Sequence, residues 1–286
     1  MLTETLTEEL KSVSDYFKAN KLKLNPQKTN MVVFRKRNLP PNHHEMNVFL
    51  DGHRLSPSNH ASFLGTTIDC TLNWGDHCNN VANKISKANG VINRVKKFLP
   101  PSSLKLLYHS FIQPHIQYTL PVWGGCNSQN KKRIINIQKR AIRTITKSYI
   151  TAHTEPRMKR LGLLKFDDMY QLQNSLLVHD CVYKKAPITI QNYISFAQDS
   201  HHSLRSQSLR PLDLRIPNYK TRAGASGFSV QGPTGWNKLS NELRAIDQKN
   251  RFKLLLKDSI LKTYENKTTC LNPRCRDKSN HNCFTG

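Results

Sequence analysis

The fold is decided by residues 104–147, LKLLYHSFIQPHIQYTLPVWGGCNSQNKKRIINIQKRAIRTITK, which have the pattern of two helices joined through proline, tryptophan and glycine. Apolar side chains in the second helix recur at helical spacing and therefore share one face. They are Ile134, Ile137, Ala141, Ile142 and Ile145. At about 100° per residue, the cations fall on the opposite face. They are Lys132, Arg133, Lys139, Arg140, Arg143 and Lys147. The stretch predicts a helical hairpin with one buried face and one basic face.

The charge of this region has a single sign. Between Asp76 and Glu155 there is no Asp or Glu, whereas Lys and Arg occur 13 times. A solvated surface helix is the plain alternative, but such a helix usually mixes signs, because like charges at i and i+4 weaken it. An unbroken positive stretch repels itself unless an anion lies against it. We therefore expect nucleic acid as the partner, bound through its phosphates.

The composition of the whole chain indicates the same partner. Its 286 residues contain 44 Lys and Arg against 19 Asp and Glu, a net charge of +25, which is far more than solubility requires. Nucleic acid is the first candidate for so basic a chain, and an anionic membrane surface is the second. No run approaches the roughly 18 apolar residues of a membrane span, so we expect no membrane partner.

The N-terminus and the cysteines indicate the compartment. The start of the chain, MLTETLTEELKSV, is acidic and helix-like, which excludes a signal peptide with a basic start and an apolar run. Seven scattered cysteines fit a reducing environment. We therefore expect the protein in the nucleus or the cytoplasm.

Residues 1–72 have the pattern of a small α+β piece. The spacing of apolar residues predicts a helix over 2–19, followed by a strand over 31–34. An Asp-Gly pair at 51–52 lies between short apolar runs and signals a β-hairpin, because both turn positions need positive φ. A third strand is expected over 62–69. Together these elements predict a small antiparallel sheet with one helix.

After this piece the apolar period becomes helical. A stripe over 81–99 is stopped by two prolines, and a further helix over 104–112 is ended or kinked by Pro114. The first of these helices carries cations on the side opposite its stripe, namely Lys87, Arg94 and Lys97. Together with the helix that ends near Lys147, these helices predict a basic helical bundle over 73–152.

The remaining chain is expected to be less regular. Residues 153–266 have a mostly helical pattern with a loop-rich insert over 198–236, and residues 267–286 form a Cys-rich tail. The predicted fold class of the whole chain is therefore α+β, mainly α.

No pattern in the sequence indicates a self-sufficient active site. The one adjacent pair of aspartates is Asp167 and Asp168 in LLKFDDMYQL, where Phe166 directly precedes the pair and a helical pattern follows. Two-metal chemistry needs carboxylates from neighbouring strands, whereas this pair fits a helix N-terminus. There is no Gly-rich phosphate loop and no Gly-x-Ser-x-Gly elbow, and we expect no required cofactor.

The tail contains a candidate metal site with the spacing C-x4-C-x5-H-x-C, formed by Cys270, Cys275, His281 and Cys283. Four soft ligands in a short segment suit tetrahedral zinc, which would stabilise a segment too small for its own core. The spacing differs from that of a standard zinc knuckle, so unstructured thiols are the alternative.

Aromatic residues lie among the cations of the middle region. Tyr108, Tyr118, Trp123 and Tyr149 are candidates for stacking on bases. Trp123 is followed by two glycines, and for this residue we favour a place in the core at the bend of the hairpin.

Five segments of the chain form an ordered series. They are LKLNPQKTNMVVF, SFLGTTIDCTLNWGDH, LKLLYHSFIQPHIQYTLPVWGG, IQKRAIRTIT followed by YITAHTEP, and GPTGWNKLSNEL. Together they resemble the C-terminal part of reverse transcriptases from non-LTR retrotransposons, of the Jockey-like group. The resemblance covers essentially the whole chain, and the order of its segments is specific.

The resemblance implies a role for each part of the chain. Residues 2–34 would be the end of a polymerase palm, with Lys28 near the incoming nucleotide. Phe63, Leu64 and Gly65 would match the primer-gripping strand. Residues 76–150 would be the helical thumb that holds the template–primer duplex, and the rest would be the C-terminal region, which in related elements often ends in cysteines.

The chain departs from that family in what it lacks. The fingers, the nucleotide-binding residues, the catalytic carboxylates and an endonuclease domain are absent from these 286 residues. The leading hypothesis is therefore a non-catalytic remnant that binds template–primer nucleic acid through phosphate contacts. The alternatives are an active reverse transcriptase whose catalytic half lies upstream or acts in trans, and a host interaction protein that uses residues 155–265.

Overall fold

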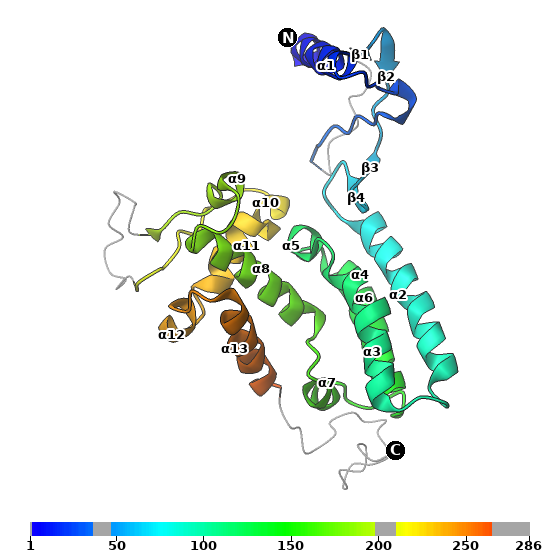
Figure 1. Ribbon diagram of the computed structural model, residues 1–286, viewed down its shortest axis with the longest axis vertical. Helices are drawn as coiled ribbons and strands as arrows, with labels where there is room; N and C mark the ends of the chain where they lie inside the picture. Colours follow the sequence, from blue (N-terminus) through cyan, green and yellow to red (C-terminus); the bar gives the residue numbers. More distant parts are fainter. Residues whose placement is uncertain (1, 37–46, 198–209, 265–286) are drawn as a thin grey trace. The chain divides into compact units, whose positions relative to one another are not determined.

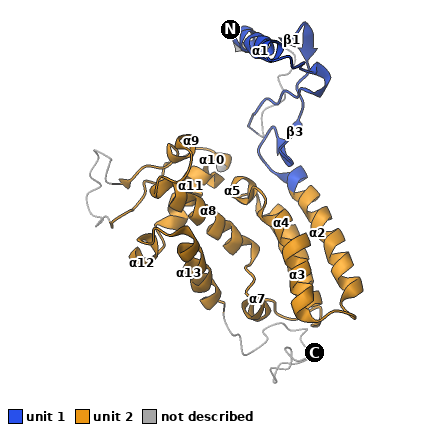
Figure 2. Ribbon diagram, viewed as in Figure 1, with its two compact units in different colours: residues 1–77 blue, residues 78–286 orange. Residues whose placement is uncertain are grey.

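The computed structural model describes residues 2–36, 47–197 and 210–264. The chain forms two compact units, Met1–His77 and Cys78–Gly286 (Figure 2). The first unit contains one long helix and two small antiparallel sheets, and the described part of the second is mainly helical (Figure 1). The predicted class, α+β and mainly α, is confirmed.

The first unit is built around a short hairpin and a helix. Its elements are α1 (Leu2–Ala19), the 3-10 helix η1 (Pro26–Lys28), β1 (Val48–Leu50), β2 (His53–Leu55), β3 (His60–Phe63) and β4 (Thr66–Asp69). Val48, Leu50 and Leu55 are buried, and Leu10 of α1 packs against them. This packing partly buries Leu10, whereas Leu6 and Val13 of the same predicted apolar stripe stay exposed.

The Asp-Gly hairpin is confirmed. Asp51 and Gly52 have φ of 47° and 77°, and they connect β1 to β2 in an antiparallel pair. The Asp51 carboxylate accepts hydrogen bonds from Ser14 Oγ at 2.7 Å and from Lys18 Nζ at 2.8 Å. The bond from Lys18 is the main reason that the pKa of Asp51 lies below its usual value. One carboxylate therefore links the turn to α1.

Two strand predictions in this unit are wrong. The segment expected as one strand over 62–69 is a second hairpin, because Leu64 and Gly65 adopt φ of 47° and 78° and reverse the chain between β3 and β4. Over 31–34 the structure has a single bridge, from Met31 to Pro57, in place of a strand. The alternation of apolar residues indicates extended backbone, but it does not show where the backbone finds pairing partners.

A half-buried carboxylate organises the turn before α2 (Gly75–Val95). Asp69 accepts hydrogen bonds from the backbone N–H of Asn73 at 3.1 Å and of Trp74 at 2.7 Å, and from both the N–H and the hydroxyl of Thr71. Burial alone would raise the pKa of Asp69, but these donors outweigh it and hold the pKa below its usual value. The carboxylate therefore fixes the start of α2.

The described part of the second unit consists of helices in two groups. The first group is α2 with α3 (Pro101–Phe111), α4 (Gln113–Gln117), α5 (Leu120–Trp123) and α6 (Ser128–Ile145). The second group is α7 (Glu155–Leu161), α8 (Phe166–Val182), α9 (Ile188–Gln191), α10 (Arg222–Ser226), α11 (Phe228–Trp236), α12 (Asn241–Arg244) and α13 (Lys249–Lys262). Helix α8 contacts α4, α5 and α6 as well as α11 and α13, and so it joins the two groups (Figure 1).

The predicted bend of the hairpin is confirmed. Helix α3 ends at Phe111, and Pro114 lies in the first turn of α4. Trp123 is fully buried, and its indole N–H donates to the carbonyl of Tyr118 at 2.8 Å. A side chain at Gly124 would clash with the ring of Tyr170 on α8. Trp123 therefore belongs to the core, and the glycine after it allows α8 to approach.

The loop-rich insert expected over 198–236 differs from the structure, because α10 and α11 lie within it. Thr221 caps α10 by accepting the N–H of Gly224 at 3.1 Å. In α11, Gly232 and Pro233 are buried, and a side chain at Gly232 would press on Val178 of α8. Packing against α8 overrides the poor helix propensity of these two residues. Residues 198–209 lie outside the described part of the chain.

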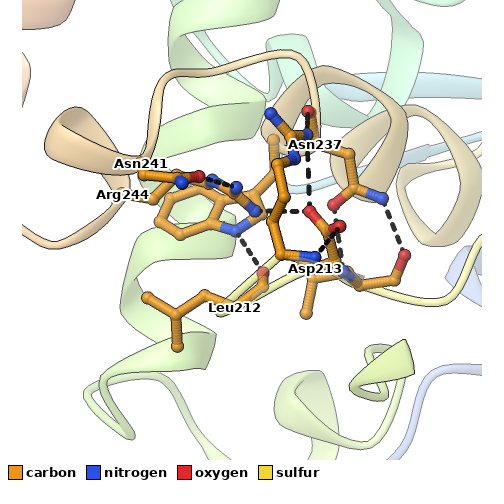
Figure 3. A network of polar contacts seen from close by, with 8 residues as sticks. Leu212, Asp213, Asn237, Asn241 and Arg244 are labelled. Atoms are coloured by element: carbon orange, nitrogen blue, oxygen red, sulfur yellow. Dashed lines mark hydrogen bonds and ion pairs between the residues drawn. The ribbon is translucent and has the colours of Figure 1, made fainter. Parts of the chain in front are cut away.

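A buried ion pair holds the segment before these helices in place (Figure 3). The Arg244 side chain is fully buried and donates to the Asp213 carboxylate at 2.6 Å. Burial alone would raise the pKa of Asp213, but the N–H of Arg210 and the Arg244 guanidinium outweigh it and lower the pKa. The Asn237 amide pairs with both the N–H and the carbonyl of Leu214, at 2.9 and 2.8 Å.

Trp236 completes this network. It is fully buried, and its indole N–H donates to the carbonyl of Leu212 at 3.0 Å. Trp236, Asn237 and Arg244 all lie in or next to the segment GPTGWNKLSNEL. These residues of the segment therefore have a structural role, which is to hold the network together.

We predict that Asp213→Ala destabilises the second unit by about 3–5 kcal/mol, because the buried Arg244 guanidinium would lose its carboxylate partner. Urea unfolding followed by tryptophan fluorescence measures the change. The control is Asp258→Ala, which removes an exposed pair with Lys262 and should cost less than about 1 kcal/mol. Equal effects of the two variants would contradict the structural role of the network.

The lowered pKa of Asp213 gives this prediction a pH dependence. The carboxylate contributes stability that is fully present above its unfolded pKa of about 3.9 and is lost as the pH falls through the lower folded value. The difference in stability between wild type and Asp213→Asn should therefore shrink on acidification below about pH 4. A difference that stays constant would contradict the ionised pair.

Candidate nucleic-acid interface

Helix α6 has the two faces that its sequence predicts. All five members of the apolar stripe are buried, and Ile134, Ile142 and Ile145 are fully inaccessible to solvent. Gln138 on the same side donates its amide N–H to the Tyr108 hydroxyl at 2.9 Å and to the Leu164 carbonyl at 3.0 Å. These contacts fix the rotation of α6 about its axis, so the cations face outward.

A hollow of about 690 Å³ lies on the basic side of the bundle. It is formed by the residues after α2, the second half of α6 and the turn after α6. Its lining residues are Lys96, Lys97, Asn136, Arg140, Arg143, Thr144, Lys147, Ser148 and Ile150. We call this surface the basic hollow. It brings together four of the cations singled out from the sequence, and it adds Lys96.

Two turns bring these side chains together. Helix α2 ends at Val95, so Lys96 and Lys97 lie on the turn that leads to α3. After α6, Lys147 adopts a φ of 49° and reverses the chain. The Nε–H of Arg143 then donates to the Ala152 carbonyl at 2.8 Å. This bond holds the returning turn against α6 and so closes one side of the hollow.

The positive charge of the basic hollow is not neutralised by a neighbouring acid within the described residues. No ion pair in this part of the chain involves Lys96, Lys97, Arg140 or Lys147. Arg143 uses one N–H on a carbonyl, which satisfies a donor but leaves the charge, and burial lowers its pKa. Cations gathered in a concave surface concentrate positive potential and attract an anion.

The other cations singled out on these helices lie outside the lining of the hollow. Lys87, Arg94 and Lys132 are exposed, and Lys139 is half-buried. Arg133 donates to the side-chain oxygens of Asn79 and, at 3.3 Å, of Asn83, so it links α6 to α2. Arg133 therefore has a structural role on the polar face of α6, which is to connect α6 to α2.

The residues singled out in the first unit are on its surface. Lys28 is exposed at the end of η1. Phe63 and Leu64 are 65% and 74% exposed at the tip of the β3–β4 hairpin, and Gly65 supplies the second turn position. The tip is therefore available for contact, in a turn rather than within a strand.

Sequence reasoning missed several residues of the hollow. Two of them, Asn136 and Thr144, lie on the same side of the helical projection as the cations Arg140, Arg143 and Lys147. The helical period would therefore have identified them if uncharged polar residues had been considered together with the charged ones. Lys96 and Ile150 carry no such signal, because each lies on a turn.

The aromatic candidates divide by burial. Tyr108 and Trp123 are in the core, and burial raises the pKa of Tyr108 to about 12. Tyr118 is 51% exposed and Tyr149 is 77% exposed. Only the exposed pair could stack on bases.

The adjacent carboxylates lie in the first turn of α8, as predicted, with Lys165 at the N-cap position. Asp167 is 3.2 Å from Lys131, and Asp168 accepts a hydrogen bond from Tyr264 at 2.5 Å. These contacts join α8 to α6 and to the end of α13. Their geometry is that of a structural helix terminus.

The described residues contain no cluster of three or more His, Cys, Asp or Glu that could hold a metal ion. The candidate zinc ligands Cys270, Cys275, His281 and Cys283 lie outside the described residues. Within that same part of the chain, no helix combines the length and apolarity that a membrane crossing requires.

Neither a protein-family model nor a solved structure matches this chain. In sequence the chain is similar to a probable RNA-directed DNA polymerase from transposon BS of Drosophila melanogaster, with 29% identity over 145 residues. The match covers 49% of this chain and 16% of the length of that relative. This similarity supports a relationship between the chain and reverse transcriptases.

Proposed function

We propose that this chain is a reverse-transcriptase-derived protein that binds template–primer nucleic acid through its phosphates. The observation that carries the proposal is the gathering of Lys96, Lys97, Arg140, Arg143 and Lys147 in one hollow, with no neutralising acid among the described residues. The similarity to a transposon polymerase supports the same class of ligand.

The dimensions of the basic face suit a nucleic-acid backbone. Lys132 and Arg143 both lie within α6, and the α-helical rise of about 1.5 Å per residue separates them by roughly 16 Å along the axis. A strand of B-form duplex advances about 3.4 Å per phosphate, so this length spans roughly five phosphates. Each arginine or lysine side chain on this face can contact one of these phosphates.

The finer assignments follow the Jockey-like, non-LTR group that the motifs resemble. We propose that residues 73–152 act as a thumb, that residues 1–72 correspond to the end of a palm, and that Lys28 and the Phe63–Gly65 tip contact nucleic acid there. No aromatic-x-Asp-Asp motif occurs in the 286 residues. Polymerase activity would therefore need carboxylates that these residues do not supply. We further propose a nuclear or cytoplasmic location and zinc in the tail.

We predict that the triple variant Lys97→Gln, Arg140→Gln, Lys147→Gln binds an RNA–DNA duplex at least about tenfold more weakly at 0.1 M salt, taken as roughly physiological. The plot of log affinity against log salt concentration should become less steep by about 2–3. Fluorescence anisotropy of a labelled duplex over a salt series measures both.

The matched control removes two lysines and one arginine elsewhere in the second unit: Lys184→Gln, Arg251→Gln and Lys253→Gln, all exposed. It has the same net charge as the test variant. Equal losses in the two variants would mean that the overall charge, and not the basic hollow, binds the duplex, and would overturn the proposal.

Arg143 should behave differently from the other cations. Arg143→Lys keeps the charge but removes the Nε–H bond to Ala152, so we expect a loss of stability of about 1–2 kcal/mol with a nearly unchanged salt dependence of binding. Urea unfolding and the anisotropy series measure the two effects. An undiminished stability would show that this bond does not hold the turn.

A further inference from the structure

The most exposed large apolar side chains of the described residues belong to Ile150, which lines the basic hollow, and to two residues next to its lining in the sequence. Among the described residues, the three large apolar side chains with the greatest exposure are Phe98 at 83%, Ile150 at 82% and Tyr149 at 77%. Ile150 lines the hollow itself. Phe98 directly follows the lining residue Lys97 in the sequence. Tyr149 stands between two further lining residues, Ser148 and Ile150. Phe98 and Tyr149 are therefore sequence neighbours of lining residues, although neither lines the hollow itself.

The rings come from two different turns. Phe98 is on the turn between α2 and α3, and Tyr149 is on the turn after α6. The amphipathic stripes that build the bundle core do not use either ring. Exposed aromatic side chains are unfavourable in water, and their occurrence on the two turns that supply lining residues of the hollow favours a ligand-binding role. The ligand must offer both negative charge and flat apolar faces.

We infer that the basic hollow takes a nucleic-acid segment with unpaired bases, whose phosphates contact the cations while its bases stack on Phe98 and Tyr149. A fully paired duplex presents phosphates but hides the faces of its bases in the helical stack. Unpaired nucleotides expose those faces, and aromatic platforms beside a positive groove are the usual means of binding them. This inference rests on the proposed function and specifies its ligand.

The size and charge of the hollow agree with such a ligand. At about 690 Å³ it has room for a short piece of strand rather than a single ion. Asn136 and Thr144 place uncharged polar groups among the cations, and these groups can hydrogen-bond to sugars or bases. An anionic membrane would also attract cations and aromatic rings. A membrane surface is flat, however, and is contacted best by side chains that project from the protein. Arg140 and Arg143 instead line a concave surface.

The test compares three ligands of one sequence: a blunt RNA–DNA duplex, the same duplex with an unpaired extension, and the unpaired strand alone. The extension carries 2-aminopurine, whose fluorescence falls when it stacks on an aromatic ring. The test variant is Phe98→Ala with Tyr149→Ala. The control is Phe34→Ala with Tyr193→Ala, which removes one exposed phenylalanine and one exposed tyrosine, neither of which lines the hollow or adjoins a lining residue in the sequence.

The inference expects the wild type to bind the extended duplex more tightly than the blunt one and to quench the 2-aminopurine. The test variant should lose this preference, about 5- to 100-fold for each ring that stacks on a base, and the quenching, while its affinity for the blunt duplex and its salt dependence stay unchanged. The control should keep both. Circular dichroism confirms that both variants are folded, as expected for exposed positions.

Two results would overturn the inference. One is equal binding of blunt and extended duplexes by the wild type, or a preference that the test variant retains. The other is stronger binding to phosphatidylserine vesicles than to the extended duplex, with the vesicle binding lost in the test variant. If none of the three nucleic acids showed salt-dependent binding, the proposed function itself would be refuted. The binding of the blunt duplex over the salt series distinguishes this outcome from a failure of the inference alone.

Discussion

The rotation of α6 about its own axis is the constraint on which the basic surface depends. Burying one isoleucine side chain contributes roughly 1.5–3 kcal/mol, and α6 buries four of them with Ala141 against α3 and α8. Turning the helix over would expose this stripe and bury its cations, at a cost of several kcal/mol for each ion. The apolar face therefore determines where the charges point, although it contacts no ligand.

The rotation of one helix is not enough to make a concave site. The basic hollow also requires the turn after α2, which brings Lys96 and Lys97, and the turn after α6, which Arg143 holds through the Ala152 carbonyl. Arg143 thus has two roles, since it closes the turn and contributes charge to the hollow. The same turns present Phe98 and Tyr149, so the cations and the exposed rings have a common structural origin.

The sequence predicted the features that follow from local periodicity and from turn chemistry. The faces of α6, the Asp51–Gly52 hairpin and the buried Trp123 belong to this class. It did not predict features that depend on distant partners. The pair Leu64–Gly65 is a weaker sequence signal for a hairpin turn than Asp-Gly. Helix α11 forms in spite of Gly232 and Pro233 because these residues pack on α8. The site was predicted in part, because the arc of α6 is periodic whereas Lys96 and Ile150 are placed by turns.

The central claim is that the basic hollow itself lies against nucleic acid, and lysine footprinting tests it most directly. The protein is treated with an acetylating reagent with and without an RNA–DNA duplex that carries an unpaired extension, and the modified lysines are quantified by mass spectrometry. The account predicts that bound nucleic acid protects Lys96, Lys97 and Lys147, while Lys184 and Lys253 react as in the free protein. Uniform protection of all these lysines, or protection that spares the hollow, would contradict it.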